Sequence, residues 1–294
     1  MYIRDLFANK KPVLSLEIFP PKKESPIEVI YETIQGLQDL RPDFISVTYG
    51  AGGSNTKRTV EIASLLKNKY GIEALAHLTC IASTKEQINL IITELEQQGI
   101  ENILALRGDM PTDPDFEFPN PLHFRYAQDL TAYLKEHSSV CIGGACYPEG
   151  HIEASSMEAD IQFLAEKVAA GAEFLITQLF FDNELFYRFM ELARDKGITV
   201  PISAGIMPVL NRKQIERITS LSGASLPKKF QRMLEKYEHN PEALKEAGIA
   251  YATEQIIDLL SWGVDGIHLY TMNKPEVARK IVGNISSIRS YLNC

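Results

Sequence analysis

The sequence has little cysteine, and its four thiols lie at Cys80, Cys141, Cys146 and Cys294. The first twelve residues carry charges and no apolar run, so we expect no secretory signal and reduced, buried cysteines. His77 and the first three cysteines could be drawn as a zinc site. They lack the tight CxxC spacing of such sites, and three of the four positions fall in expected strands. We therefore expect no metal.

Motifs for nucleotides and membranes are also missing. The sequence contains no GxGxxG or GxxxxGK[ST], so a phosphate-bearing cofactor would depend on helix N-termini and isolated cations. No apolar run reaches the ~20 residues that span a bilayer. The net charge of -8 argues against a nucleic-acid or anionic-membrane partner. We expect a cytoplasmic protein that binds a small molecule and forms a homo-oligomer.

The chain does contain a repeated alternation of short apolar runs and longer segments with helical periodicity. Eight such units favour the α/β class and a (β/α)8 TIM barrel, with extra helices between the seventh and eighth strands. No linker divides the chain, so we expect one domain, 1–294, whose first ten residues form a lid or short helix over the barrel floor. The expected strands are Val13–Phe19, Asp43–Tyr49, Ile72–Thr79, Asn102–Leu106, Val140–Cys146, Phe174–Phe180, Val200–Ile206 and Gly266–Thr271.

Polar residues stand at the C-terminal ends of most of these strands. In a barrel these ends face one mouth, where their side chains converge. A single buried Glu, His or Gln would more readily be a satisfied core group, whereas a whole set favours an active site. The set comprises Glu17, Thr48, Tyr49, His77, Thr79, Arg107, Asp109, Tyr147, His151, Gln178, Asp182, Tyr270 and Thr271.

Some of the candidate site residues have alternative interpretations. Arg107 and Asp109 end an apolar run, as active-site charges do in α/β sheets, but either could be an ordinary solvated residue. Lys167 is a candidate phosphate ligand on an expected helix, although helix lysines are usually solvated.

Glu17 is the most informative residue because it lies inside an apolar strand. Burial disfavours the anion, so we expect a raised pKa that suits a general acid near neutral pH. The alternative is an ion pair with a barrel arginine such as Arg107, which would keep Glu17 ionised. We favour the acid.

The strand ends also carry a resemblance to a known family. The motifs are Leu16-Glu17-Ile18-Phe19-Pro20-Pro21, Val47-Thr48-Tyr49-Gly50-Ala51, Ala76-His77-Leu78-Thr79-Cys80, Leu106-Arg107-Gly108-Asp109, Tyr147-Pro148-Glu149-x-His151, Ile176-Thr177-Gln178-x-Phe180-Phe181-Asp182 and Tyr270-Thr271-Met272-Asn273. Together they resemble the 5,10-methylenetetrahydrofolate reductases. The match covers essentially the whole chain and is similar to the short bacterial type, which implies that no regulatory domain is present.

The resemblance implies a flavin-dependent barrel enzyme that binds FAD non-covalently. Such enzymes pass hydride from NADH or NADPH through FAD to methylenetetrahydrofolate in a ping-pong sequence. The product, 5-methyltetrahydrofolate, feeds methionine synthesis and one-carbon metabolism. Glu17 resembles the acid that protonates folate N10, and Asp109 resembles a carboxylate that lies by the flavin and helps to bind the pterin.

Further positions are implied by the same resemblance. Those implied to contact FAD are Thr48, Tyr49, Ala51, His77, Arg107, Gly108, Asp109, Tyr126, Ala127, Tyr147, His151, Ala154, Asp160 and Lys167. Those implied to contact the substrate are Asp109, Gln178, Arg212, Tyr270, Met272 and Lys274.

The chain departs from the family pattern at a few positions. Lys274 stands where bacterial relatives often have Arg, and Arg212 stands where some have Phe. Phe163 and Glu166 occupy helix positions that are polar or cationic in relatives. Two other classes stay open: a pterin-binding barrel without redox chemistry, which Glu17 and Asp109 disfavour, and a zinc hydrolase barrel.

Overall fold

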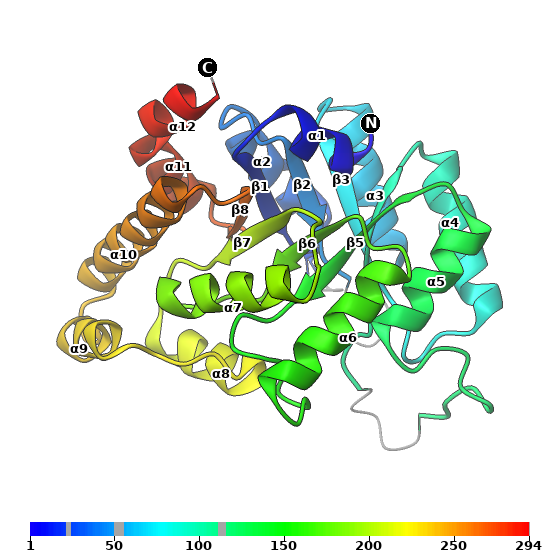
Figure 1. The fold of residues 1–294 in the computed structure, drawn as a ribbon. Helices are drawn as coiled ribbons and strands as arrows, with labels where there is room; N and C mark the ends of the chain where they lie inside the picture. Colours follow the sequence, from blue (N-terminus) through cyan, green and yellow to red (C-terminus); the bar gives the residue numbers. More distant parts are fainter. Residues whose placement is uncertain (22–24, 50–55, 111–115, 294) are drawn as a thin grey trace.

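The structure, a computed structural model, describes residues 1–21, 25–49, 56–110 and 116–293. Within them, eight parallel strands pair in chain order and close on themselves, so that β8 lies beside β1 (Figure 1). The predicted (β/α)8 barrel is therefore confirmed. The strands are β1 (Val13–Ile18), β2 (Phe44–Val47), β3 (Glu73–Thr79), β4 (Asn102–Leu106), β5 (Cys141–Cys146), β6 (Phe174–Thr177), β7 (Ile202–Ile206) and β8 (Gly266–Tyr270).

Helices form the outer layer of the barrel, and three of them separate β7 from β8 as predicted. The helix after β4 begins at Ala127, where the Asp129 carboxylate accepts the backbone N–H groups of Arg125 and Tyr126. The helices are α1 (Ile3–Asn9), α2 (Glu28–Gln38), α3 (Thr56–Asn68), α4 (Lys85–Gln97), α5 (Ala127–His137), α6 (Met157–Ala169), α7 (Asn183–Asp195), α8 (Arg212–Ser222), α9 (Lys228–Tyr237), α10 (Pro241–Trp262), α11 (Pro275–Asn284) and α12 (Ser286–Leu292).

The barrel interior changes from apolar at its floor to polar toward its mouth. Residues two apart on a strand share a face, so Val13, Ser15 and Glu17 follow one another up the inside of β1. Val13 belongs to a buried floor cluster with Phe44 and Phe174, whereas Ser15 and Glu17 meet polar neighbours. This gradient places the chemistry of the barrel at one end.

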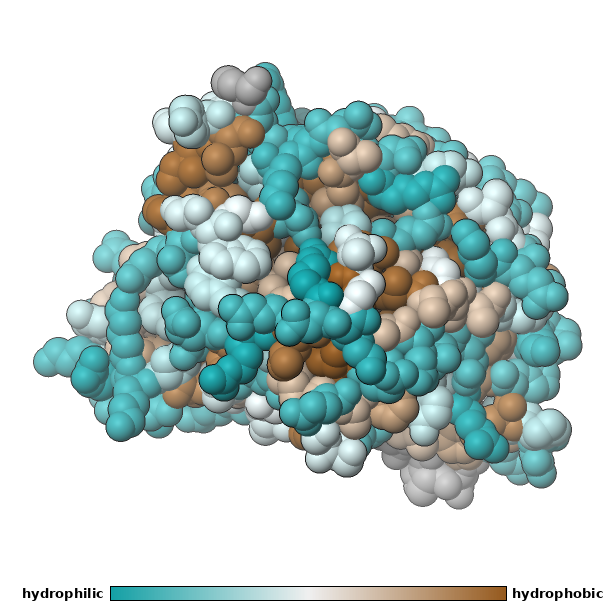
Figure 2. All heavy atoms as spheres, in the orientation of Figure 1, coloured by the Kyte–Doolittle hydropathy of each residue, from teal (hydrophilic) through white to brown (hydrophobic). Residues whose placement is uncertain are grey.

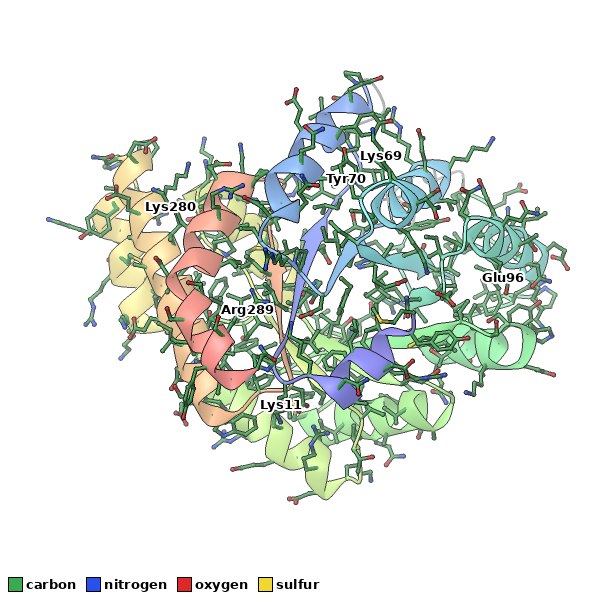
Figure 3. All side chains as sticks on the ribbon, turned by 90° about the horizontal axis from the view of Figure 1, so that it is seen from above. Lys11, Lys69, Tyr70, Glu96, Lys280 and Arg289 are labelled. Atoms are coloured by element: carbon green, nitrogen blue, oxygen red, sulfur yellow. The ribbon has the colours of Figure 1, made fainter. Side chains whose placement is uncertain are left out.

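Helix α1 covers the floor, which confirms that part of the sequence prediction. Its Ile3 is fully buried, and the ring of Phe7 lies 5.9 Å from that of Phe174. Figure 3 looks onto this end and shows Lys11 and Arg289 near α1, whereas Lys69, Glu96 and Lys280 lie out on the surrounding helices. Burying a side chain such as Ile3 contributes about 1.5–3 kcal/mol to folding.

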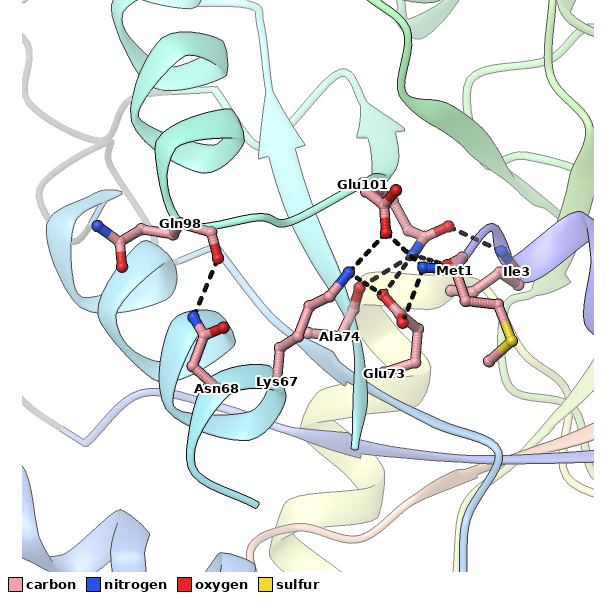
Figure 4. A network of polar contacts seen from close by, with 9 residues as sticks. Met1, Ile3, Lys67, Asn68, Glu73, Ala74, Gln98 and Glu101 are labelled. Atoms are coloured by element: carbon pink, nitrogen blue, oxygen red, sulfur yellow. Dashed lines mark hydrogen bonds and ion pairs between the residues drawn. The ribbon is translucent and has the colours of Figure 1, made fainter. Parts of the chain in front are cut away.

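A polar network ties the chain start to this floor (Figure 4). The Met1 ammonium contacts Glu101 and lies 3.3 Å from Glu73 Oε2. Lys67 Nζ lies 3.1 Å from Glu73 and 2.7 Å from Glu101. Asn102 donates to Glu73 at 2.9 Å, so the buried Glu73 carboxylate is well satisfied.

A second layer of core lies between the barrel and its helices. Most of the face in Figure 2 is hydrophilic, as expected when the apolar side chains fill that layer instead. A separate cluster, which includes Phe181, Val209, Phe230 and Leu244, joins α8, α9 and α10 to the loops after β6 and β7. None of the helices in the described residues is long and apolar enough to cross a membrane.

Candidate active site

A cavity of about 800 Å³ opens at the C-terminal ends of the strands. The structure therefore brings together, at the predicted mouth, many of the residues singled out in the sequence. Those that line the cavity are Glu17, Thr48, Tyr49, His77, Thr79, Arg107, Gly108, Asp109, Tyr147, His151, Gln178 and Tyr270. Lys57 also lines it and was missed, because a lysine on an amphipathic helix carries no signal that separates it from a solvated one.

The turn after β4 depends on Gly108. Its φ of 87° is in the left-handed region, and an added Cβ would lie 2.8 Å from the Cβ of Thr79. The carbonyl of Arg107 accepts the N–H groups of Cys80 and Ile81, which ties the end of β3 to this turn. Glycine is thus required where Arg107 and Asp109 reach the cavity.

Glu17 is surrounded by polar side chains of the neighbouring strands. Its Oε2 lies 3.3 Å from His268 Nε2, 3.4 Å from Ser46 Oγ and 3.6 Å from His77 Nε2. Behind His268, Ser15 Oγ lies 2.7 Å from Nδ1. If Ser15 donates to Nδ1, the ring proton stays on Nε2 and donates to the Glu17 carboxylate.

Both sequence interpretations of Glu17 need correction. Burial is the largest single influence and raises the pKa of Glu17. The hydrogen bond from His268, the proximity of the His77 and His268 rings and the hydrogen bond from Ser46 together outweigh burial, so this pKa lies below its ordinary value of 4.5. The predicted rise of the pKa is therefore wrong for this structure. Arg107 is not the partner either, since its guanidinium pairs with Glu153.

His77 contributes a neutral ring to the cavity wall. Burial lowers the pKa of His77 to about 4, so the imidazole is uncharged near neutral pH. Its Nε2 is buried and has no hydrogen-bond partner among the residues that the structure describes. A buried ring nitrogen without a partner, on the wall of a cavity, suits a polar group of a ligand.

His268, beside Glu17, is a second residue that was not predicted, although the sequence could have indicated it. It stands two positions before Tyr270 in β8, and that spacing places both on the inner face of the strand. The register pairs His268 with Ser15 and Tyr270 with Glu17. The alternation within β8 was a usable signal, but the pairing with β1 could not be read from the sequence.

Replacing His268 with phenylalanine should raise the pKa of Glu17, because the favourable hydrogen bond disappears while burial stays. A ¹³C NMR titration of glutamate-labelled protein would measure this, with the Glu17 signal assigned from Glu17→Gln. Ser15→Ala is the control, since it leaves the imidazole beside Glu17 and should cause a smaller rise. An unchanged Glu17 pKa in His268→Phe would show that the imidazole does not hold the carboxylate ionised.

Aromatic side chains after β5 line the cavity, and charged groups of α6 contact the backbone of the same segment. Tyr147 and His151 pack edge to face at 4.7 Å, and burial raises the pKa of Tyr147 to about 12. The His151 N–H donates to Asp160 at 3.2 Å. Lys167 Nζ donates to the carbonyl of Ala145 at 2.7 Å, and burial lowers its pKa. Lys167 is therefore not the freely solvated lysine that was the alternative.

Arg212 does not lie where the sequence reasoning placed it. Its guanidinium pairs with Glu216 and Glu238, and it is not among the residues that line the cavity. Glu238 follows α9, so this contact joins the start of α8 to the end of α9. The structure therefore does not place Arg212 among the lining residues, and its contact with a substrate stays a prediction.

The remaining predicted residues lie near the cavity but do not line it. Tyr126 and Ala127 begin α5, and Ala154 donates its N–H to the His151 carbonyl. Met272 and Lys274 follow β8 beside the end of β1. Ala51 lies outside the described residues.

The cysteines are not brought together as a zinc site would need. Cys141 begins β5 at the floor, paired with Asn102, whereas Cys80 follows β3 at the mouth. Burial raises the pKa of both thiols to about 12, which disfavours the thiolates that bind zinc. Among the described residues, no group of three or more His, Cys, Asp or Glu could hold a metal.

Comparison with known proteins identifies the family. Residues 2–286 match the family described as Methylenetetrahydrofolate reductase. The chain belongs to this family. A 5,10-methylenetetrahydrofolate reductase of Pectobacterium carotovorum subsp. carotovorum is 38% identical over 271 residues, which make up 91% of this chain and 88% of that protein.

Other methylenetetrahydrofolate reductases differ in length. Methylenetetrahydrofolate reductase (NADH) 1 of Arabidopsis thaliana is 35% identical over 299 residues, covering 97% of this chain, and the chain spans 50% of that protein. An uncharacterized protein from Clostridium thermocellum that binds two copies of 5-methyl-5,6,7,8-tetrahydrofolic acid has a TM-score of 0.67 at 15% identity, over 98% of this chain and 99% of that chain. The similarity to the Clostridium thermocellum protein shows only that the two chains share a fold.

Proposed function

We propose that this protein reduces 5,10-methylenetetrahydrofolate to 5-methyltetrahydrofolate with hydride from NADH or NADPH, in a ping-pong sequence through non-covalently bound FAD. The product would feed methionine synthesis and one-carbon metabolism. The observation that carries the proposal is the partly buried Glu17 carboxylate, which reaches the 800 Å³ cavity of a chain from the methylenetetrahydrofolate reductase family.

The residues around the cavity fit a flavin dinucleotide. The volume lies within the ~300–1,000 Å³ that is usual for small-molecule sites. Tyr49 and Tyr147 offer aromatic walls, and His77 offers an unsatisfied ring nitrogen. Arg107 on the lining offers a cation for a diphosphate, and Lys167, which donates to the carbonyl of the lining residue Ala145, would be a second one. When bound there, FAD would supply the redox chemistry by accepting hydride from the nicotinamide and delivering it to the folate.

Glu17 would hold and donate the proton that folate reduction requires. A proton on N10 lets that nitrogen leave as a neutral amine, which opens the five-membered ring to an iminium that accepts hydride. In this structure the pKa of Glu17 is lowered, with burial opposed by His268. A ligand laid over Glu17 would exclude water and oppose the anion further, so we propose that the bound substrate raises this pKa and makes Glu17 an acid.

The other predicted residues would bind and orient. Asp109, on the cavity wall, would lie by the flavin and contact the pterin, and Gln178, Met272 and Lys274 would contact the folate. Tyr270 already donates its hydroxyl to the Thr177 carbonyl at 2.8 Å, so it would offer its ring to a ligand. A single catalytic domain, a homo-oligomer and a cytoplasmic location are part of the same proposal.

Purified protein should be yellow, and denaturing it should release FAD rather than FMN, because the cavity joins aromatic walls to cations suited to a diphosphate. Chromatography of the released flavin checks this. A colourless protein that cannot be reconstituted with FAD would contradict the proposal and favour a pterin-binding barrel without redox chemistry.

The nicotinamide is identified by a separate measurement. Anaerobic stopped-flow mixing of the oxidised protein with NADH, and then with NADPH, gives the rate of flavin bleaching for each donor. Subsequent mixing with methylenetetrahydrofolate should restore the oxidised spectrum. If the flavin is bleached but methylenetetrahydrofolate does not restore the oxidised spectrum, the protein is a flavoprotein that acts on another class of substrate.

A further inference from the structure

The Arg107 guanidinium forms an ion pair with the carboxylate of Glu153 in this structure. Its Nη2 lies 2.9 Å from Glu153 Oε1, and its Nη1 contacts Oε2, which makes a two-pronged pair. Arg107 lines the cavity, but Glu153 does not. Among the described residues, Glu153 forms the one ion pair that involves Arg107.

The two partners differ in how freely they can move. Glu153 lies between β5 and α6, and its N–H donates to His151 Nδ1 at 3.1 Å. Two further hydrogen bonds hold this segment in place. The His151 N–H donates to the Asp160 carboxylate, and the Glu149 carboxylate accepts the Ser225 N–H at 3.0 Å. The carboxylate is thus attached to an anchored loop. The long Arg107 side chain is the part that can turn.

The pair is of the kind that a ligand can replace. The Glu153 side chain is 57% exposed and that of Arg107 is 24% exposed, and ion pairs open to solvent contribute little to stability. A diphosphate presents more charge and several oxygens to the same planar guanidinium. An anionic ligand in the cavity therefore competes with Glu153 for Arg107.

We propose that Glu153 is a displaceable counter-ion that weakens the binding of the dinucleotide cofactor and speeds its release. The proposal rests on the proposed function, because it takes FAD as the anionic ligand. Arg107 is charged with either partner, so the exchange moves no proton and changes only which anion the guanidinium meets.

Glu153→Gln should tighten FAD binding by about fivefold at low ionic strength, since a glutamine competes less well for the guanidinium. Fluorescence titration measures the dissociation constant, and dilution of the yellow protein measures the rate of flavin release, which should fall. The gain should shrink at high salt, because screening weakens the charge attraction between Arg107 and the diphosphate.

Glu158→Gln is the matched control. It removes the same single charge from the first turn of α6, where Glu158 is fully exposed and forms no ion pair with Arg107. Riboflavin is the matched ligand, since it lacks phosphates, and its affinity should be equal in Glu153→Gln and the parent.

The outcomes separate the two proposals. Failure of FAD to bind to the parent defeats the proposed function. If the parent binds FAD, equal or weaker binding by Glu153→Gln overturns the counter-ion proposal, and weaker binding would show that the pair persists and orients Arg107. An equal gain in Glu158→Gln, or a gain for riboflavin, would overturn it by assigning the effect to overall charge or to shape.

Discussion

Replacing Glu17 with glutamine should slow reoxidation by methylenetetrahydrofolate at least about 100-fold, while reduction by the nicotinamide stays near the parental rate. The two half-reactions differ in whether they require a proton donor. Hydride transfer from the nicotinamide asks for no proton on a ring nitrogen, whereas the folate cannot form its iminium until N10 is protonated. General-acid assistance of ~10²–10⁴-fold corresponds to about 3–5 kcal/mol of barrier.

The structure indicates that glutamine at position 17 would preserve the local hydrogen bonds. Ser46 and His268 both meet Glu17 Oε2, and a glutamine keeps an oxygen that can accept hydrogen bonds from these groups. The variant should therefore fold and stay yellow. Glu17→Asp keeps a proton donor on a shorter arm, so it should fall between the parent and Glu17→Gln in the folate half-reaction.

Anaerobic stopped-flow measurement of each half-reaction checks this expectation. Equal slowing of both would make Glu17 a residue that positions the flavin. If neither half-reaction slows, the proton comes from another group. If Glu17→Asp is as slow as Glu17→Gln, the placement of the carboxyl group matters as much as its proton.

The sequence predicted the architecture of the site because all strands of a (β/α)8 barrel have their C-terminal ends at the same end of the barrel. Once eight strand–helix units are recognised, the polar residue at each strand end must face one mouth. Glu17, His77, Arg107, Tyr147 and Gln178 were placed at the cavity by that rule alone, and the structure has all of them there.

The partners of these residues could not be predicted, because contacts depend on register and on loops. His268 meets Glu17 since β8 pairs with β1 across the closure of the barrel. Glu153 reaches Arg107 through the course of the segment after β5. Arg212 pairs with Glu238, which lies 26 residues further along the chain and follows α9. The periodicity of apolar residues predicts which face of a strand or helix is buried, but it does not predict which side chains pair with one another.

Gly248→Ala should lower the free energy of unfolding by at least about 2 kcal/mol, because overpacking against a fixed group costs ~1–3 kcal/mol or more. Gly248 is buried within α10, and an added Cβ would lie 1.8 Å from the carbonyl oxygen of Val209. That oxygen belongs to the backbone between β7 and α8, so it cannot rotate away as a side chain would. Val209 is itself buried in the cluster with Phe181 and Phe230, and moving it would disturb α8 and α9.

Gly283→Ala is the matched control, since Gly283 also lies within a helix, α11, but an added Cβ would meet no atom within 4 Å. There alanine should be neutral or stabilising by up to about 1 kcal/mol, which is the helix-propensity gain that Gly248→Ala also receives and loses to the clash. Thermal unfolding of the two variants compares them, with Tm expected to fall by about 3 °C or more in Gly248→Ala alone. Equal Tm values would show that α10 can move away from Val209 at little cost, and that the close approach at Gly248 does not fix the helices of this cluster.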